Sequence, residues 1–78
     1  MKIKKEIEDK LTLKGKRVVK GPDWIWGNQD GYGPGTIISD VDDTGWVTVE
    51  WDRNVPSNKY RMGALEWGAP KFDLTIIE

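Results

Sequence analysis

The side chains that carry most enzyme chemistry are scarce in this chain of 78 residues. It has no histidine and no cysteine, so a thiol nucleophile, an imidazole base and the usual zinc ligands are missing. The two serines, Ser39 and Ser57, stand outside any nucleophile motif, and the pair Asp42–Asp43 is explained by a turn between strands. The glycines of 31–35 lack the lysine and the helix of a phosphate-binding loop. We therefore predict a non-catalytic domain with no metal and no cofactor.

The aromatic residues are the chemically informative ones. The chain has five tryptophans, two tyrosines and one phenylalanine, and the stretch GPDWIWGNQDG (21–31) places Trp24 and Trp26 one residue apart. Large rings in a loop either fill the core or line a groove that binds a partner. We expect Trp51, which alternates with valines, to lie in the core. We expect Trp24 to point inward and Trp26 to be half exposed.

Charged residues near these rings extend the candidate binding surface. Asp23 and Asp30 either attract lysine or arginine on a partner or serve the loop itself, Asp23 by capping its backbone N–H groups and Asp30 by forming a turn with Gly31. Arg61 is expected to form an ion pair, and Tyr60 to pack with its hydroxyl toward solvent. The full set of candidate peptide-binding residues is Trp24, Trp26, Asp23, Asp30, Trp46, Tyr60, Arg61 and Trp67.

Short strands separated by glycine and proline are the elements that must position these residues. Strands are predicted over 16–20, 35–41, 46–52, 58–62 and 74–78, with 46–52 showing the clearest alternation of apolar and polar residues. The segment 63–73 reads as irregular. This pattern predicts an all-β fold, a small SH3-like antiparallel barrel of about five strands. Residues 1–14 are expected to form a lead-in, either frayed or a short helix, ahead of a domain over 15–78.

Charge and hydropathy narrow the classes of partner. Twelve basic residues against thirteen acidic ones give a net charge of −1, whereas nucleic-acid binding favours a basic surface. No apolar run is long enough to cross a bilayer. We therefore expect a protein or peptide partner, no nucleic acid, no membrane, and a monomer in the cytoplasm or the nucleus.

The order of several motifs resembles one known family. RVVKGPDWIWGNQDG is similar to the opening of the Mind bomb/HERC (MIB/HERC) domain, whose pattern is roughly V-x-R-G-P-D-W-x-W-x-x-Q-D-G. The strand WVTVEWD, the stretch NKYRMG and the closing FDL follow in the family's order. The resemblance covers residues 15–77.

That resemblance implies a fold and a role. The family has an SH3-like β-barrel and is found in large E3 ubiquitin ligases of the RING and HECT types, where it is a non-catalytic recognition module. In Mind bomb, paired copies hold the cytoplasmic tails of Notch ligands. The stretch YRMG followed by FDL is closer to the copies in HECT-type ligases.

The sequence departs from the family pattern in four places, of which Ile25 would change specificity if it faces the ligand. Lys20 replaces an arginine, Ile25 replaces a polar or basic residue, Asn28 replaces an aspartate, and the longer loop ALEWGAPK adds Trp67. Three functions remain open. The first is recognition of a peptide through an aromatic groove, the second is structural or intramolecular docking with no separate ligand, and the third is reading of methylated lysine.

Overall fold

The computed structural model describes residues 13–77, which form six β-strands and no helix. The helix considered for the lead-in falls on residues 1–12 and so lies outside the described residues. Within 13–77 there is also no helix of the length and hydropathy needed to span a membrane. The strands are β1 (Arg17–Lys20), β2 (Gly35–Ile37), β3 (Trp46–Trp51), β4 (Asn58–Glu66), β5 (Ala69–Phe72) and β6 (Leu74–Ile76).

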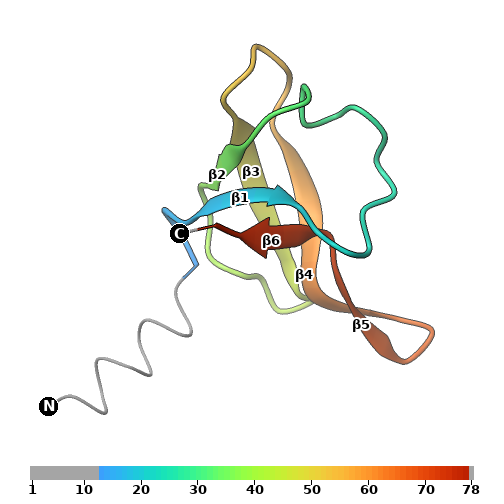
Figure 1. Ribbon diagram of the computed structural model, residues 1–78. Coiled ribbons are helices and arrows are strands. Elements are labelled where there is room, and N and C mark those ends of the chain that lie inside the picture. The colour runs from blue at the N-terminus through green and yellow to red at the C-terminus, as the bar shows by residue number, and fades with distance from the viewer. Residues whose placement is uncertain (1–12, 78) are drawn as a thin grey trace, which may run out of the picture.

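All six strands belong to one antiparallel sheet with the order β5-β4-β3-β2-β1-β6 (Figure 1). The predicted all-β class is confirmed, but the sheet does not close into a barrel. A single residue, Asp73, separates β5 at one edge from β6 at the other. The chain therefore passes from one edge to the other at Asp73, whose N–H donates to the carbonyl of Arg61 in β4 at 2.9 Å. The strand order pairs β5 only with β4 and β6 only with β1, so the chain itself, through Asp73, links the two edges.

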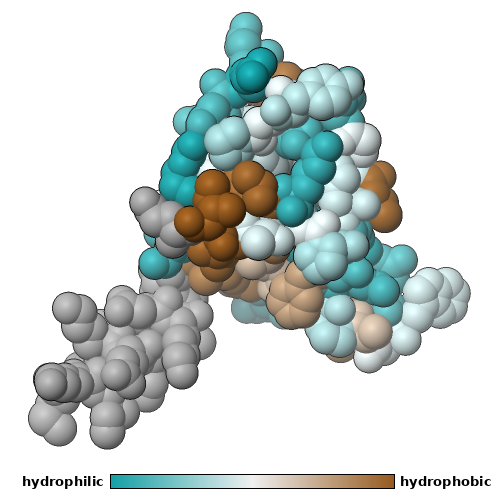
Figure 2. Space-filling view, viewed as in Figure 1, coloured by the Kyte–Doolittle hydropathy of each residue, from teal (hydrophilic) through white to brown (hydrophobic). Residues whose placement is uncertain are grey.

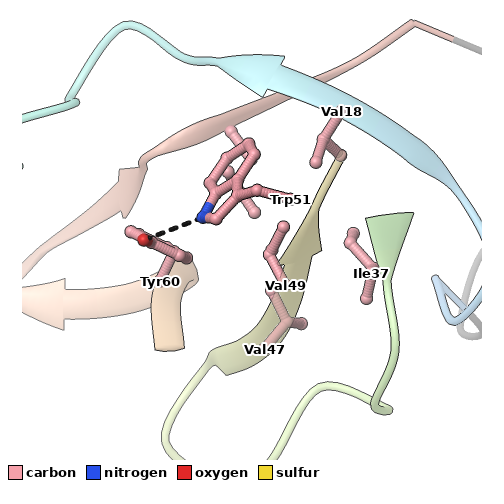
Figure 3. Close-up of a cluster of buried hydrophobic side chains, with 7 residues drawn as sticks. Val18, Ile37, Val47, Val49, Trp51 and Tyr60 are labelled. Atoms are coloured by element: carbon pink, nitrogen blue, oxygen red, sulfur yellow. Dashed lines mark hydrogen bonds between the residues drawn. The ribbon is translucent and has the colours of Figure 1, made fainter. Parts of the chain in front are cut away.

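The core lies on the concave side of the curved sheet. In β3, Val47, Val49 and Trp51 are buried while Glu50 is exposed, as the alternating pattern predicts. Their partners come from every strand except β5 (Figure 3). The buried cluster consists of Val18, Ile37, Val47, Val49, Trp51, Tyr60 and Leu74.

The segment predicted to be irregular is a β-hairpin. β4 continues to Glu66, turns through Trp67 and Gly68, and returns as β5. A register shift between Met62 and Ala64 interrupts the pairing around Gly63, which has φ +102°. This bulge hides the alternation that normally identifies a strand in a sequence. The hairpin projects away from the rest of the sheet (Figure 1).

The tryptophan loop, residues 21–31, connects β1 toward β2 without forming a strand. Trp24 and Trp26 pack against the core as half-buried side chains, and Ile25 between them is 66% exposed. Elsewhere on the molecule, apolar side chains gather over β1 and β6 (Figure 2). The exposed isoleucines Ile76 and Ile77 belong to this C-terminal end.

Candidate functional site

Tyr60 is the centre of an aromatic cluster that joins the tryptophan loop to the core. Its ring stacks on Trp24 at 5.1 Å between centroids, with an interplanar angle of 19°. Trp51 and Trp26 meet the same ring edge-on, at 5.4 Å and 6.2 Å. Stacked and edge-to-face contacts of this kind add stabilisation beyond the buried area. The loop is thus fixed by its rings. Trp26 is half buried, as predicted, and Trp24 packs inward against the core but is also only half buried.

The polar atoms of these rings are satisfied within the domain. The Tyr60 hydroxyl accepts from Trp51 Nε1 at 3.1 Å and donates to Gln29 Oε1 at 3.0 Å. The expectation that this hydroxyl faces solvent is wrong, because Tyr60 is fully buried. Burial also raises the pKa of Tyr60 above its ordinary value. Trp24 Nε1 donates to the Gly27 carbonyl at 2.9 Å. The indole N–H groups of Trp24 and Trp51 therefore serve the fold.

A buried ion pair between Arg61 and Asp73 lies beside this cluster. Arg61 Nη2 is 2.7 Å from Asp73 Oδ1, and Arg61 Nε is 3.0 Å from Asp73 Oδ2. Trp26 Nε1 donates to the same carboxylate at 2.9 Å. The ion pair predicted for Arg61 is confirmed. Its partner, Asp73, was missed by the sequence reasoning, although the FDL motif that contains it was noticed.

Hydrogen bonding sets the protonation of this pair. Burial alone raises the pKa of Asp73, but the bonds from the Arg61 side chain and backbone and from Trp26, together with the Arg61 charge, more than offset it. The pKa of Asp73 therefore lies below its ordinary value. The hydrogen bond to Asp73 raises the pKa of Arg61 in turn, against the opposing effect of burial. Both groups are charged, and the pair is a fixed structural element.

Asp23 is bound across the chain instead of capping its own loop. Its Oδ2 accepts from the Phe72 N–H at 2.7 Å, and its own N–H donates to the Phe72 carbonyl at 3.1 Å. Its carbonyl accepts from Arg61 Nη2 at 3.0 Å. These three bonds hold the tryptophan loop against β5 and β4. They also overturn the local-cap interpretation of Asp23.

Between the tryptophan loop and the hairpin lies a groove of about 290 Å³. We call it the loop groove; its lining residues are Pro22, Asp23, Trp24, Ile25, Arg61, Glu66 and Lys71. The first four form a largely apolar wall, and the last three form a charged wall in which Glu66 pairs with Arg61. The structure thus brings together three of the candidate residues, Asp23, Trp24 and Arg61, on one surface. Ile25 joins them as an apolar residue that is 66% exposed.

The remaining candidates lie elsewhere. Asp30 is 3% exposed, accepts from the Tyr32 N–H at 3.1 Å and approaches Lys20 Nζ at 3.7 Å. Trp46 packs against Trp26, with 6.4 Å between the ring centroids, and does not line the loop groove. Trp67 is 97% exposed at the hairpin tip. No group of metal-ligating side chains gathers among residues 13–77.

The chain is similar to proteins of one family over nearly all of the folded region. The Mib_herc2 family matches residues 15–78. The E3 ubiquitin-protein ligase HERC2 of Mus musculus is 42% identical to this chain over 66 residues. The E3 ubiquitin-protein ligase Ufd4 of Drosophila melanogaster is 44% identical over 64 residues. Each of these two matches covers 82% of this chain. The E3 ubiquitin-protein ligase MIB2 of Gallus gallus is 48% identical over 62 residues, or 69% of this chain. The chain spans only 1%, 2% and 6% of the length of these three relatives.

Proposed function

The chain belongs to the Mib_herc2 family, and from that premise we propose that it is a non-catalytic recognition domain of an E3 ubiquitin-protein ligase. The relatives that share the domain are named as such ligases. The chain itself has no cysteine and no histidine, so it lacks the side chains for thiol or imidazole catalysis. A binding role fits these residues better than a chemical one.

We propose that the ligand is a peptide segment of a protein and that it binds in the loop groove. The observation that carries this proposal is that the tryptophan loop and the hairpin together line one groove. Ile25, which is 66% exposed, lies in its lining. An apolar side chain of the peptide would pack on Ile25 and Pro22. The charged wall of Glu66, Lys71 and Arg61 would select the polar residues beside that anchor.

The rigidity of the groove supports this assignment. Asp23 and Arg61 are held by hydrogen bonds to Phe72 and Asp73, so the groove is formed before a ligand arrives. A preformed site loses less conformational entropy on binding. The Trp24 ring stacked on Tyr60 gives the apolar wall a stiff backing.

A methyl-lysine cage receives less support. Such a cage needs several open ring faces around a cation. Tyr60 is fully buried, and the chain's own Lys20 already lies over Trp24, with Nζ 6.0 Å from the ring centroid. In the docking alternative, neighbouring domains of the parent ligase occupy the groove. It uses the same surface as peptide recognition, so an experiment must distinguish the two.

The test is a selection of random displayed peptides on the 78-residue chain, followed by an NMR titration of the enriched peptides. We expect shifts in the Ile25 methyl, Trp24 indole and Lys71 amide signals. The variant Ile25→Ser should lose binding, since it removes exposed apolar area without touching the core. The matched control is Ile38→Ser, which changes an isoleucine that is 41% exposed and outside the groove lining.

Two results would count against peptide recognition. One is equal enrichment of peptides on Ile25→Ser and on the unchanged chain. The other is a complete lack of enrichment on both, in which case the docking alternative becomes the better account of the groove.

A further inference from the structure

The face of the hairpin that points away from the loop groove is apolar and exposed. Leu65 lies directly opposite Pro70 in the β4–β5 register, so their side chains share one face. Phe72, two residues after Pro70, lies on the same face and is 42% exposed, while Leu65 is 72% exposed. Glu66 and Lys71, by contrast, line the loop groove. The hairpin is therefore a wall with a different surface on each side.

Trp67 adds a large ring at the tip of this wall. Trp67 and Gly68 are the two residues of the turn, with φ +55° and +78°. Positive φ at both positions identifies a type I′ turn, for which asparagine and glycine are the favoured residues. A tryptophan in this backbone conformation is strained. Because its side chain is 97% exposed, packing within residues 13–77 does not compensate that strain.

An acidic turn faces the same side of the hairpin. Asp42, Asp43, Thr44 and Gly45 line a hollow of about 470 Å³ together with Gly63 and Leu65. The Asp42 carboxylate accepts from the Thr44 N–H at 2.9 Å and the Trp46 N–H at 3.0 Å. These bonds, with that from the Thr44 hydroxyl, lower the pKa of Asp42. Asp43 is exposed, so the hollow carries negative charge next to an apolar wall.

We propose that this hairpin surface, made of Leu65, Trp67, Pro70 and Phe72 with Asp42 and Asp43, is a second docking site. Its occupant is a protein segment that carries an apolar side chain flanked by lysine or arginine. The apolar side chain would contact Leu65 and the Trp67 ring, and the basic residues would meet the acidic turn. The negative charge beside the apolar wall selects this partner over an acidic one.

This site is independent of the loop groove. It uses other residues, and its ligand would leave Ile25 untouched. Trp67 has the property expected of an interface anchor, since tryptophans dominate binding energy when a partner buries them. The fold of the described residues does not explain why an exposed tryptophan occupies this strained position. Burial of the Trp67 ring by a bound partner would explain it.

The experiment compares displayed random peptides selected on the chain and on its Trp67→Asn variant. Asparagine suits the turn, so this variant should still fold. It should also be more stable than the unchanged chain, with an unfolding midpoint at a higher denaturant concentration. Peptides that require Trp67 should be enriched in lysine or arginine around an apolar residue. For such a peptide, we expect Kd to rise on the order of tenfold or more in Trp67→Asn, and to rise also in Asp43→Asn and at higher salt. Ile25→Ser should leave it unchanged.

Several outcomes would overturn the proposal. Peptides that depend on Trp67 but are acidic or uncharged would refute the charge selection. The absence of any Trp67-dependent peptide would refute the docking site. Concentration-dependent self-association in sedimentation, lost in Trp67→Asn, would show that the occupant is a second copy of this chain. A loss of stability in Trp67→Asn would show that the ring serves the fold.

Discussion

The guanidinium of Arg61 lies alongside the carboxylate of Asp73, with Nη2 2.7 Å from Oδ1 and both side chains almost fully buried. Asp73 is also the residue through which the chain links the two edges of the sheet. Trp26 donates its indole N–H to the same carboxylate. The pair therefore connects the sheet edges, the tryptophan loop and the charged wall of the loop groove at one point.

Replacing Asp73 with asparagine should destabilise the whole domain. The change removes the buried counter-charge of Arg61 and leaves the half-exposed Glu66 as the carboxylate beside its guanidinium. Breaking a buried pair in this way typically costs about 3–5 kcal/mol. Chemical denaturation followed by tryptophan fluorescence measures the free energy of unfolding. Asp40→Asn, at an exposed aspartate, is the control and should change little. A similar small change for both variants would contradict the role of the pair.

Acid should unfold the domain as its aspartates gain protons. The pKa of Asp73 is lowered in the fold, as are those of Asp42 and Asp52. A lowered folded-state pKa gives stability that is fully present above the unfolded pKa of about 4 and is lost as the pH falls through the folded pKa. The free energy of unfolding should thus be level near neutral pH and fall below about pH 4. A stability that stays constant down to about pH 2 would refute this expectation.

The sequence predicts those strands in which the alternation of apolar and polar residues is unbroken. The strand 46–52 and the buried Trp51 were expected from alternation alone, and the family was identified from the order of its motifs. The hairpin was missed, because the bulge at Gly63 and a tryptophan in a turn that favours asparagine both disguise it. A closed barrel was expected, but the sheet stays open and only Asp73 links its two edge strands. Whether two edge strands pair depends on their arrangement in space, which no local pattern in the sequence describes.

The candidate site was predictable only as a set of residue types. The motifs placed Asp23, Trp24 and Arg61 among the candidates, and these three do line one groove. Asp73 was missed because its importance depends on contacts with residues 12 and 47 positions away. The burial of Tyr60 depends likewise on rings from two distant segments. Such three-dimensional relationships leave no periodic pattern in the chain.

The variant Tyr60→Phe should isolate the contribution of one buried hydroxyl. It keeps the ring that stacks on Trp24 but removes the acceptor of the Trp51 indole N–H. A buried donor left without a partner costs about 1–3 kcal/mol. The free energy of unfolding should fall by that amount, and the Trp51 indole signal should shift in NMR spectra.

The hydroxyl also holds Gln29, so Gln29→Ala provides the comparison for Tyr60→Phe. Gln29 is exposed, and its loss should cost less because water can replace it at the Tyr60 hydroxyl. A larger effect of Gln29→Ala than of Tyr60→Phe would mean that the loop contact, and not the Trp51 bond, is the main contribution.

Gly21, at the start of the tryptophan loop, lies against the backbone of Phe72 and Leu74, and its replacement by alanine should be poorly tolerated. A Cβ at this position would lie 2.7 Å from the backbone of Leu74 and from the Phe72 carbonyl oxygen. The Gly21 N–H also donates to the Asp73 carbonyl at 2.6 Å, so the loop cannot move away without losing that bond. Forced overpacking of this kind costs about 1–3 kcal/mol. Gly33→Ala is the matched control, since a Cβ there meets no atom closer than 3.6 Å. If thermal unfolding ranks Gly33→Ala as the more damaging change, then the approach of the loop to β6 does not limit stability, and the rigidity inferred for the loop groove would lose its physical basis.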